Sequence, residues 1–291
     1  NASHSRSPIE ACTVSSTLAA GGQTALDVPR GCTGVGRHLV ATVHDVSGKL
    51  VEWSAAADIT IDEVLGGSLE MPAYQGPIDR LLQATNIPPS VVDLSATLAQ
   101  QSNGLPLWAA NAAPMQRDVD VAVRALGAPA AGDLEQVQVF TDEPGAPERF
   151  CTLGRRAAVG AGPAVDVGAS VIVAPASKPL VSATSIAWDA GAGGQAAQVH
   201  VVAVDYTTPN ADSFNWAFVG DGAGTSVAIP AMPADLAATL LPMVDPTAGM
   251  TSYASSDADG YHAALPGVVA AIFTAWGALA GAEVATCSYY W

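Results

Sequence analysis

The chain has few basic residues. Only 11 of its 291 residues are lysine or arginine, and just two of these are lysines, Lys49 and Lys178, against 27 aspartates and glutamates. Proteins that bind nucleic acid or an anionic membrane surface need clustered Lys and Arg to neutralise phosphates. The net charge of −16 therefore argues against both partners, and it is typical of a protein that must stay soluble outside the cell.

Motifs for catalysis and metal binding are also lacking. The sequence has no C-x-x-C and no G-x-S-x-G, and its five histidines are scattered. A hydrolytic triad needs a nucleophile, a base and an orienting group, and a zinc site needs closely spaced Cys and His. Acidic residues are numerous, but nothing selects one carboxylate pair for glycoside hydrolysis. The sequence thus predicts no enzyme and no cofactor, with a secreted hydrolase as the third-ranked interpretation.

Long hydrophobic runs are absent as well. The most apolar stretch, Gly267 to Ala282, is too short for a transmembrane helix and is interrupted by Gly277 and Gly281. The chain starts with the polar segment Asn1 to Pro8 without an initiating methionine, as a processed exported protein would. We expect an extracellular or cell-surface protein that does not span the membrane.

Four cysteines are present. Cys12 and Cys32 lie in one N-terminal segment, whereas Cys151 and Cys287 are far apart, so the simplest of the three pairings is 12–32 with 151–287. Chain entropy would give about 3 kcal/mol for the short loop and about 5 kcal/mol for the long one. Free thiols are the alternative interpretation. Disulfides would agree with an oxidising, extracellular compartment.

Strand signals recur about every ten residues. Short runs with β-branched residues or period-two alternation are bounded by Gly, Pro, Asn or Asp. They cover residues 37–44, 50–53, 58–64, 91–98, 119–126, 134–140, 170–174, 182–188, 197–206, 214–219, 226–229, 268–276 and 282–289. Helix is expected only in short pieces, at Pro77 to Ala84 and Pro233 to Leu241. The pattern predicts an all-β protein, with strands spaced as in sandwiches or barrels.

Turn signals suggest how these strands are connected. Asp45 to Gly48 and Gly220 to Gly224 are typical of hairpin turns. Val173 to Pro179 holds two prolines between strand runs and is the best candidate for a domain boundary. We therefore expect two domains, residues 1–175 and 176–291. A 151–287 disulfide would then join them into one rigid unit.

The segment from Pro179 to Leu241 is similar to a fibronectin type III or immunoglobulin-like sandwich domain. A proline-led strand ends in Trp188, a longer alternating strand contains Tyr206, and a third strand carries Trp216. The resemblance implies that Trp188 packs between two sheets, with the other two aromatics on neighbouring strands. After Leu241 the pattern departs from that family. The first half faintly repeats the same order, so the expected architecture is two tandem antiparallel β-sandwich domains.

Two acidic turns resemble fragments of calcium loops. Ser255 to Gly260 and Asp221-Gly222 combine Asp with Gly, as turns that wrap a hard cation do. A complete EF-hand loop is absent, because no Glu stands at its twelfth position. Plain surface turns are therefore the favoured interpretation, and a structural calcium ion is the alternative.

Exposed aromatics are the best candidates for binding. These are Trp108, in a Leu-Pro-Leu-Trp stretch, and the C-terminal Tyr289, Tyr290 and Trp291. The terminal residues fit a last strand that docks on the core, but if exposed they would form an adhesive patch for a protein or a sugar. The leading hypothesis is a non-enzymatic structural or adhesive subunit of an extracellular assembly, which associates with itself or other proteins through a surface of low charge. A carbohydrate- or ligand-binding module is the alternative.

Overall fold

The computed structural model describes residues 33–47, 49–61, 70–102, 105–112, 121–127, 134–158, 164–231, 233–273 and 283–291. Strands dominate this part of the chain, as the sequence predicts. The expected disulfide between Cys12 and Cys32 lies outside the described residues.

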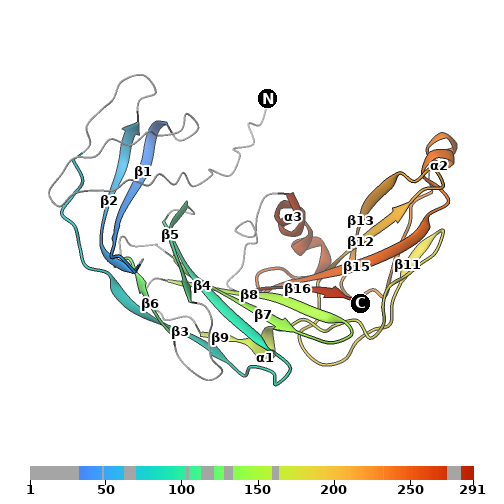
Figure 1. Ribbon diagram of the computed structural model, residues 1–291, viewed down its shortest axis with the longest axis horizontal. Helices are drawn as coiled ribbons and strands as arrows, with labels where there is room; N and C mark the ends of the chain where they lie inside the picture. Colours follow the sequence, from blue (N-terminus) through green and yellow to red (C-terminus); the bar gives the residue numbers. More distant parts are fainter. Residues whose placement is uncertain are drawn as a thin grey trace.

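An eight-stranded antiparallel sheet forms the centre of the fold (Figure 1). Its order is β13-β12-β15-β16-β8-β7-β4-β5. The strands are β4 (Asp93–Ser102), β5 (Leu105–Ala112), β7 (Leu134–Glu143), β8 (Glu148–Ala158), β12 (Val199–Thr207), β13 (Ser213–Asp221), β15 (Val244–Ser255) and β16 (Glu283–Tyr290). The sheet is strongly curved, which gives it a concave and a convex side.

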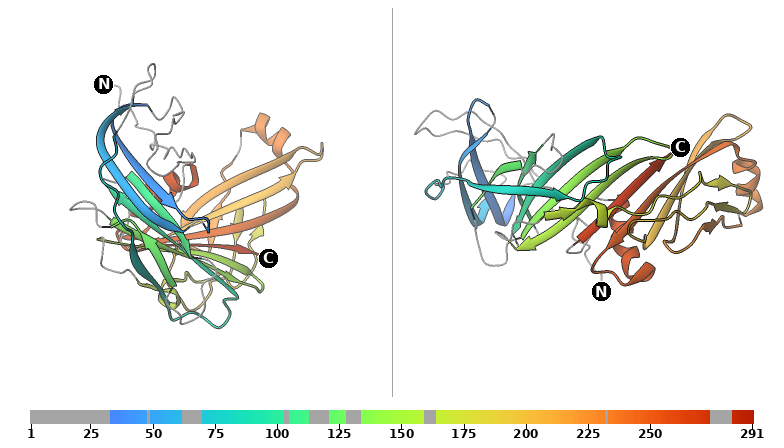
Figure 2. Two further views of the ribbon diagram at one scale, coloured as in Figure 1. Left: turned by 60° about the vertical axis from the view of Figure 1, so that its left-hand side comes forward. Right: turned by 90° about the horizontal axis from the view of Figure 1, so that it is seen from below.

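Two small sheets cover the convex side (Figure 2). One has the order β6-β3-β9 and the other β10-β11-β14. Their strands are β3 (Ile78–Thr85), β6 (Val121–Ala125), β9 (Ala164–Asp166), β10 (Leu180–Val181), β11 (Ser185–Ala187) and β14 (Ser226–Ala228). Apolar side chains from these sheets and from the convex face of the large one form the main core, for example Leu82, Val139, Ile186 and Val202. The architecture is thus layered β-sheet, as expected, and the finer assignment to tandem sandwiches stays a prediction.

A separate hairpin stands at one end of the molecule. It consists of β1 (Gly34–His44) and β2 (Leu50–Ile61) and packs through a small cluster of Leu50, Trp53 and Leu126. The turn predicted at Asp45 is confirmed, because its Oδ1 accepts hydrogen bonds from the Ser47 and Lys49 amides at 2.8 and 2.9 Å.

The helices are α1 (Val167–Ser170), α2 (Ala234–Leu240) and α3 (Gly260–Phe273). The prediction of α2 is confirmed, with Pro233 at its N-cap. Two other expectations are wrong: residues 78–85 form β3 rather than a helix, and 268–273 belong to α3 rather than to a strand. A short apolar run fits either structure, and here α3 buries Ala264 and Val268 against the concave face beside Val199 and Val201.

The connection around Gly220 to Gly224 also differs from the prediction. The turn exists, with Asp221 Oδ1 accepting from the Ala223 amide at 2.9 Å. However, β13 pairs with β12 and β14 pairs with β11, so the turn passes the chain from the large sheet to a small one rather than closing a hairpin. Gly222 allows this crossing because a Cβ there would lie 2.3 Å from the Ala197 carbonyl oxygen.

The large sheet crosses the boundary predicted near residue 175. Strands β5, β4, β7 and β8 precede it, and β16, β15, β12 and β13 follow it. The two halves meet where β16 pairs with β8, and there the Cys151–Cys287 disulfide joins directly opposite residues. The predicted 151–287 pairing is confirmed, with an S–S distance of 2.06 Å. The division into two domains stays a prediction.

Candidate functional site

Three exposed aromatic rings lie on the concave face of the central strands. Phe140 is on β7, Phe150 on β8 and Tyr290 on β16, and they are 38%, 40% and 56% exposed. Phe140 is directly opposite Thr152, and Phe150 is directly opposite Ser288, so each ring is diagonal to the next across adjacent strands. Phe150 and Tyr290 touch edge to face, with ring centroids 5.8 Å apart. We call these three residues the aromatic diagonal.

Strand alternation puts the diagonal on the concave face. Cys151 and Cys287 belong to the core, and Phe150 and Tyr290 occupy positions of opposite parity on the same two strands. Val284 has the same parity as Tyr290 and packs beside α3, which lies within the hollow of the sheet in Figure 1. The aromatic diagonal and α3 therefore share the concave side.

Polar groups surround the aromatic diagonal. Ser288 and Thr251 hydroxyls lie 3.0 Å apart on neighbouring strands, and Asp142 is directly opposite Phe150. Three buried polar atoms on this face have no hydrogen-bond partner among the described residues: Asp142 Oδ1, Thr286 Oγ1 and Arg156 Nε. Buried polar groups in native proteins are nearly always satisfied by protein, water or a ligand. Asp142 and Thr286 are next to the aromatic diagonal and give it unused hydrogen-bonding capacity, whereas Arg156 lies six residues beyond Phe150 on β8.

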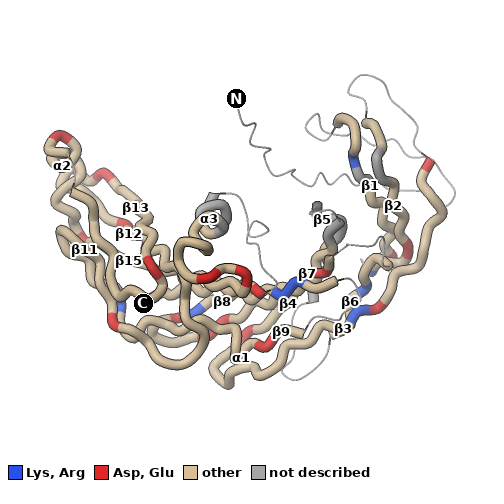
Figure 3. Tube along the Cα trace, turned by 180° about the vertical axis from the view of Figure 1, so that it is seen from behind, with Lys and Arg blue, Asp and Glu red and all other residues tan. Residues whose placement is uncertain are grey.

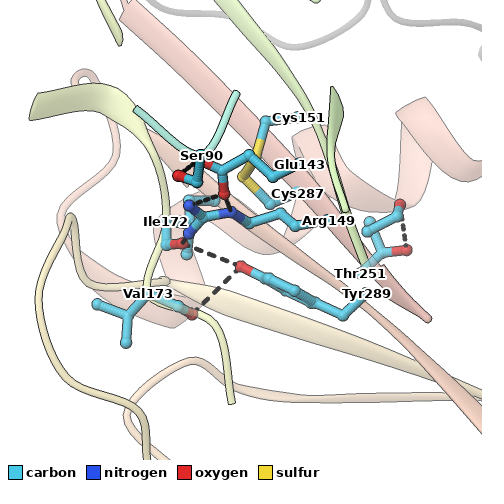
Figure 4. Close-up of a disulfide and its surroundings, with 10 residues drawn as sticks. Ser90, Glu143, Arg149, Cys151, Ile172, Val173, Thr251, Cys287 and Tyr289 are labelled. Atoms are coloured by element: carbon cyan, nitrogen blue, oxygen red, sulfur yellow. Dashed lines mark hydrogen bonds and ion pairs between the residues drawn. A yellow bond between two sulfur atoms is a disulfide. The ribbon is translucent and has the colours of Figure 1, made fainter. Parts of the chain in front are cut away.

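A polar network on the convex side holds the same strands (Figure 4). Arg149 pairs with Glu143, and Glu143 Oε1 accepts from the Ser90 hydroxyl at 2.8 Å. The Tyr289 hydroxyl donates to the carbonyl oxygens of Ile172 and Val173, at 3.1 and 3.2 Å. Burial raises the pKa of this phenol far above its usual value, so it remains a donor.

This network and the disulfide fix the backbone under the aromatic diagonal. Phe150 stands between Arg149 and Cys151, and Tyr290 follows Tyr289 directly. Their backbone positions are therefore set by neighbours packed on the other side of the sheet. A binding surface with a rigid backbone loses less conformational entropy when a ligand binds.

The aromatic residues predicted from the sequence to bind a ligand differ in exposure and location. Tyr290 is exposed and belongs to the aromatic diagonal. Tyr289 is fully buried, which corrects its assignment as a binding residue, because alternation turns its ring into the core. Trp291 is half-buried and packs against the core, with its ring centroid 6.4 Å from that of Tyr289. Trp108 lies on β5 opposite Gln100, and its side chain is outside the described residues.

Phe140 and Phe150 were missed by sequence reasoning. The strand around Phe140 was recognised, but its face could not be assigned without knowing which residues enter the core. Strand β8 was not recognised at all. In the structure Cys151 and Leu153 are buried and alternate with Phe150 and Thr152, but the sequence has apolar residues at both parities and so carried no signal for the exposed face.

A buried serine–histidine pair lies on the convex face. His200 Nδ1 is 2.8 Å from Ser252 Oγ, and the two residues are directly opposite on β12 and β15. Burial lowers the pKa of His200, against the opposing effects of a Gly222 backbone hydrogen bond and the Asp221 charge. Ser252 is 0% exposed and His200 is 6% exposed, so a substrate has no access to this pair.

In the two acidic turns, the carboxylate oxygens accept hydrogen bonds from neighbouring residues of the same turn. Asp221 Oδ1 accepts from a turn amide, and Asp257 Oδ1 accepts from the Ser256 hydroxyl at 3.1 Å. Over the described residues, no group of three or more His, Cys, Asp or Glu side chains is arranged to hold a metal ion.

A separate cavity of about 420 Å³ opens near the ends of β8 and β16. Its charged lining is already engaged: Arg155 donates to the Ala164 carbonyl and pairs with Glu283, while Asp166 caps α1 and accepts from Asn86 Nδ2 at 2.7 Å. It is therefore a weaker candidate than the aromatic diagonal.

In the described part of the chain, no helix is both long and apolar enough to cross a membrane.

Comparisons with known proteins do not assign the chain to a family. No protein-family model matches the sequence, and no curated protein matches it either.

Proposed function

We propose that this is a non-catalytic, extracellular adhesive protein that binds a neutral carbohydrate on the concave face of its large sheet. The observation that carries the proposal is the aromatic diagonal beside two unpartnered buried polar atoms, Asp142 Oδ1 and Thr286 Oγ1. Sites for small ligands combine apolar and aromatic surface with a few placed polar groups. A sugar ring has this composition too, with an apolar face and a rim of hydroxyls.

The charges around the site favour a neutral ligand. Asp142 is opposite Phe150, Glu148 is opposite Tyr290, and Asp93 is opposite Asp142. Arg156 is the basic residue on the same face of β8. Carboxylates repel sulfated or uronic-acid glycans, whereas they accept hydrogen bonds from neutral sugar hydroxyls.

Retention on an array of neutral and anionic oligosaccharides tests the proposal. We expect binding to neutral glycans, and a loss of at least about tenfold in affinity for Phe150→Ala and Tyr290→Ala, about 1.4 kcal/mol each. Tyr74→Ala is the matched control, because Tyr74 is also exposed, at 42%, but lies outside the large sheet.

Two results would count against this site. Binding to anionic glycans alone would contradict the charge argument. Full binding by Phe150→Ala together with its loss in Trp108→Ala would move the site to β5, the strand that carries Trp108.

A further inference from the structure

The molecule has strands without a second neighbour at its two opposite ends (Figures 1 and 2). Within the described part of the chain, β1 pairs only with β2, and β13 pairs only with β12. An edge strand carries unpaired backbone N–H and C=O groups that can pair with a strand of another chain. Natural proteins usually block such edges with lysine, proline or a bulge.

Strand β13 has none of these protections. It pairs with β12 over nine consecutive positions without a register shift, and Ser213–Asp221 contains neither lysine nor proline. Asn215 and Ala217 are exposed along it. By contrast β5, the opposite edge of the same sheet, contains Pro106 and faces a register shift at Gln100 and Gln101. Of these two edges, β13 is therefore better suited to pair with a strand of another chain.

The β1 edge is apolar and regular in its middle part. Register shifts lie at both ends of its pairing with β2, whereas Leu39 to Val43 pair with β2 without one, so this stretch is the part of the edge that can add a strand. Val35 and Val43 on β1 are 79% and 39% exposed, and Val51 on β2 is 39% exposed. The hairpin packs on the rest of the molecule through the small cluster around Trp53. A two-stranded sheet by itself is marginally stable in water, so β1 would gain from a third strand.

The distribution of charged residues favours contact between a β1 edge and a β13 edge over contact between two β13 edges (Figure 3). All 11 basic residues lie at or before Lys178, and residues 179–291 carry nine acidic residues and no basic one. Asp212 precedes β13 and Asp221 is its last residue, so two β13 edges repel each other. Strand β1 carries Arg37 and two histidines and has no acidic residue.

We propose that copies of this chain associate head to tail, with β1 of one copy adding to the β13 edge of the next. The contact is heterologous, because the two partner surfaces differ. Each pairing leaves a free β1 and a free β13 at opposite ends, so association continues into a filament or closes into a ring. This interaction is separate from the carbohydrate site, because neither edge includes a residue of the aromatic diagonal.

Two proline variants test this head-to-tail contact. Val43→Pro on β1 and Ala217→Pro on β13 each remove a backbone N–H and place a ring in the strand, which blocks the addition of another strand at that edge. Light scattering and native mass spectrometry should show wild-type protein growing beyond dimers with concentration, and each variant alone as a monomer. An equimolar mixture should form one-to-one dimers and nothing larger, because each variant keeps one working edge.

The mixing result uses only the unmutated edge of each variant, so it does not require the mutated strand to stay ordered. Wild-type protein that remains monomeric at high concentration overturns the proposal. So does a Val43→Pro protein that still dimerises alone, since its contact then does not use the β1 edge. A mixture that stays monomeric overturns it as well. Glycan binding should be unchanged in both variants, which separates this test from that of the proposed function.

Discussion

The two faces of the central sheet are built from the same strands but differ in almost every property. On β16, Cys287 and Tyr289 face the convex side and are 0% exposed, whereas the alternate residue Tyr290 is 56% exposed. On β8, Cys151 is buried and Phe150 is 40% exposed. On β8 and β16, alternation along the strand thus separates a buried face that stabilises the fold from exposed rings available for binding.

The two faces meet different needs at the junction where β8 pairs with β16: the convex face makes the backbone rigid, and the concave face carries the proposed binding residues. One row of directly paired residues on the convex face runs from His200 through Ser252, Cys287 and Cys151 to Thr141. This row crosses the junction between the two halves of the chain. The aromatic diagonal crosses the same junction on the concave face, so the convex side sets the geometry of the proposed binding surface.

Breaking the disulfide should have the largest effect on the convex face. We expect the double variant Cys151→Ala with Cys287→Ala to lose about 4 to 5 kcal/mol of unfolding free energy, because the bridge closes a loop with a sequence separation of 136. Urea denaturation measures the loss. Cys12 and Cys32 remain in place, so the comparison isolates this bridge. A change below about 1 kcal/mol would mean that the β16–β8 ladder is stable without it.

Removing Arg80 should be nearly as costly. Its Nε donates to Glu135 Oε1 at 2.9 Å, and the Glu135 side chain is 0% exposed. Arg80→Leu removes this cation from a buried carboxylate to which Gln100 Nε2 also donates, at 3.3 Å, and we expect a cost of about 3 kcal/mol. Arg155→Leu is the control, because Arg155 and its partner Glu283 are 47% and 57% exposed, and exposed pairs contribute about 0 to 1 kcal/mol. Equal losses in urea unfolding would refute this burial argument.

Acidification should weaken the convex face through His200. Because burial lowers its folded-state pKa below the unfolded value of about 6.5, the unfolded state binds more protons as the pH falls. This stability contribution is present above about pH 6.5 and is lost progressively below it. Unfolding free energies of wild type and His200→Gln, measured from pH 7.5 to 5, should diverge in slope. His262→Gln, at an exposed histidine, is the matched control.

The concave aromatics should matter least for stability. Phe150→Ala should cost about 1 kcal/mol or less, since the ring is partly exposed and loses mainly its edge-to-face contact with Tyr290. Tyr289→Ala, one residue before Tyr290, should cost about 3 to 5 kcal/mol because it empties a core position. Thermal or urea unfolding of the pair measures the contrast between faces. Similar costs for both variants would show that the two faces share the stabilising role.

Local pattern was enough for much of the secondary structure. Strand β12 is rich in β-branched residues over Val199–Thr207, and α2 begins after Pro233, as predicted. The errors fell on short runs that suit either helix or strand. The sequence predicts a helix at Pro77 to Ala84, but these residues belong to β3, which pairs with β6 on one side and β9 on the other. Such tertiary pairing overrides weak local propensity.

The candidate site was harder to predict than the elements that carry it. Tyr290 and the Cys151–Cys287 pair could be named from the sequence, since terminal aromatics and distant cysteines are visible there. Phe140 and Phe150 could not, because their exposure depends on which face of β7 and β8 the small sheets cover. That choice is made by residues far away in the chain, such as Leu82.

Composition and local pattern were sufficient to indicate acidity, the distant disulfide and a chain rich in strands, because these depend on residue identity and short-range spacing. The order of strands, the union of both halves of the chain in one sheet and the position of the aromatic diagonal arose only from tertiary structure. They depend on hydrogen bonds between segments far apart in sequence, such as β8 with β16. Once that pairing is set, the two-residue period of each strand assigns every side chain to the core or to the concave face.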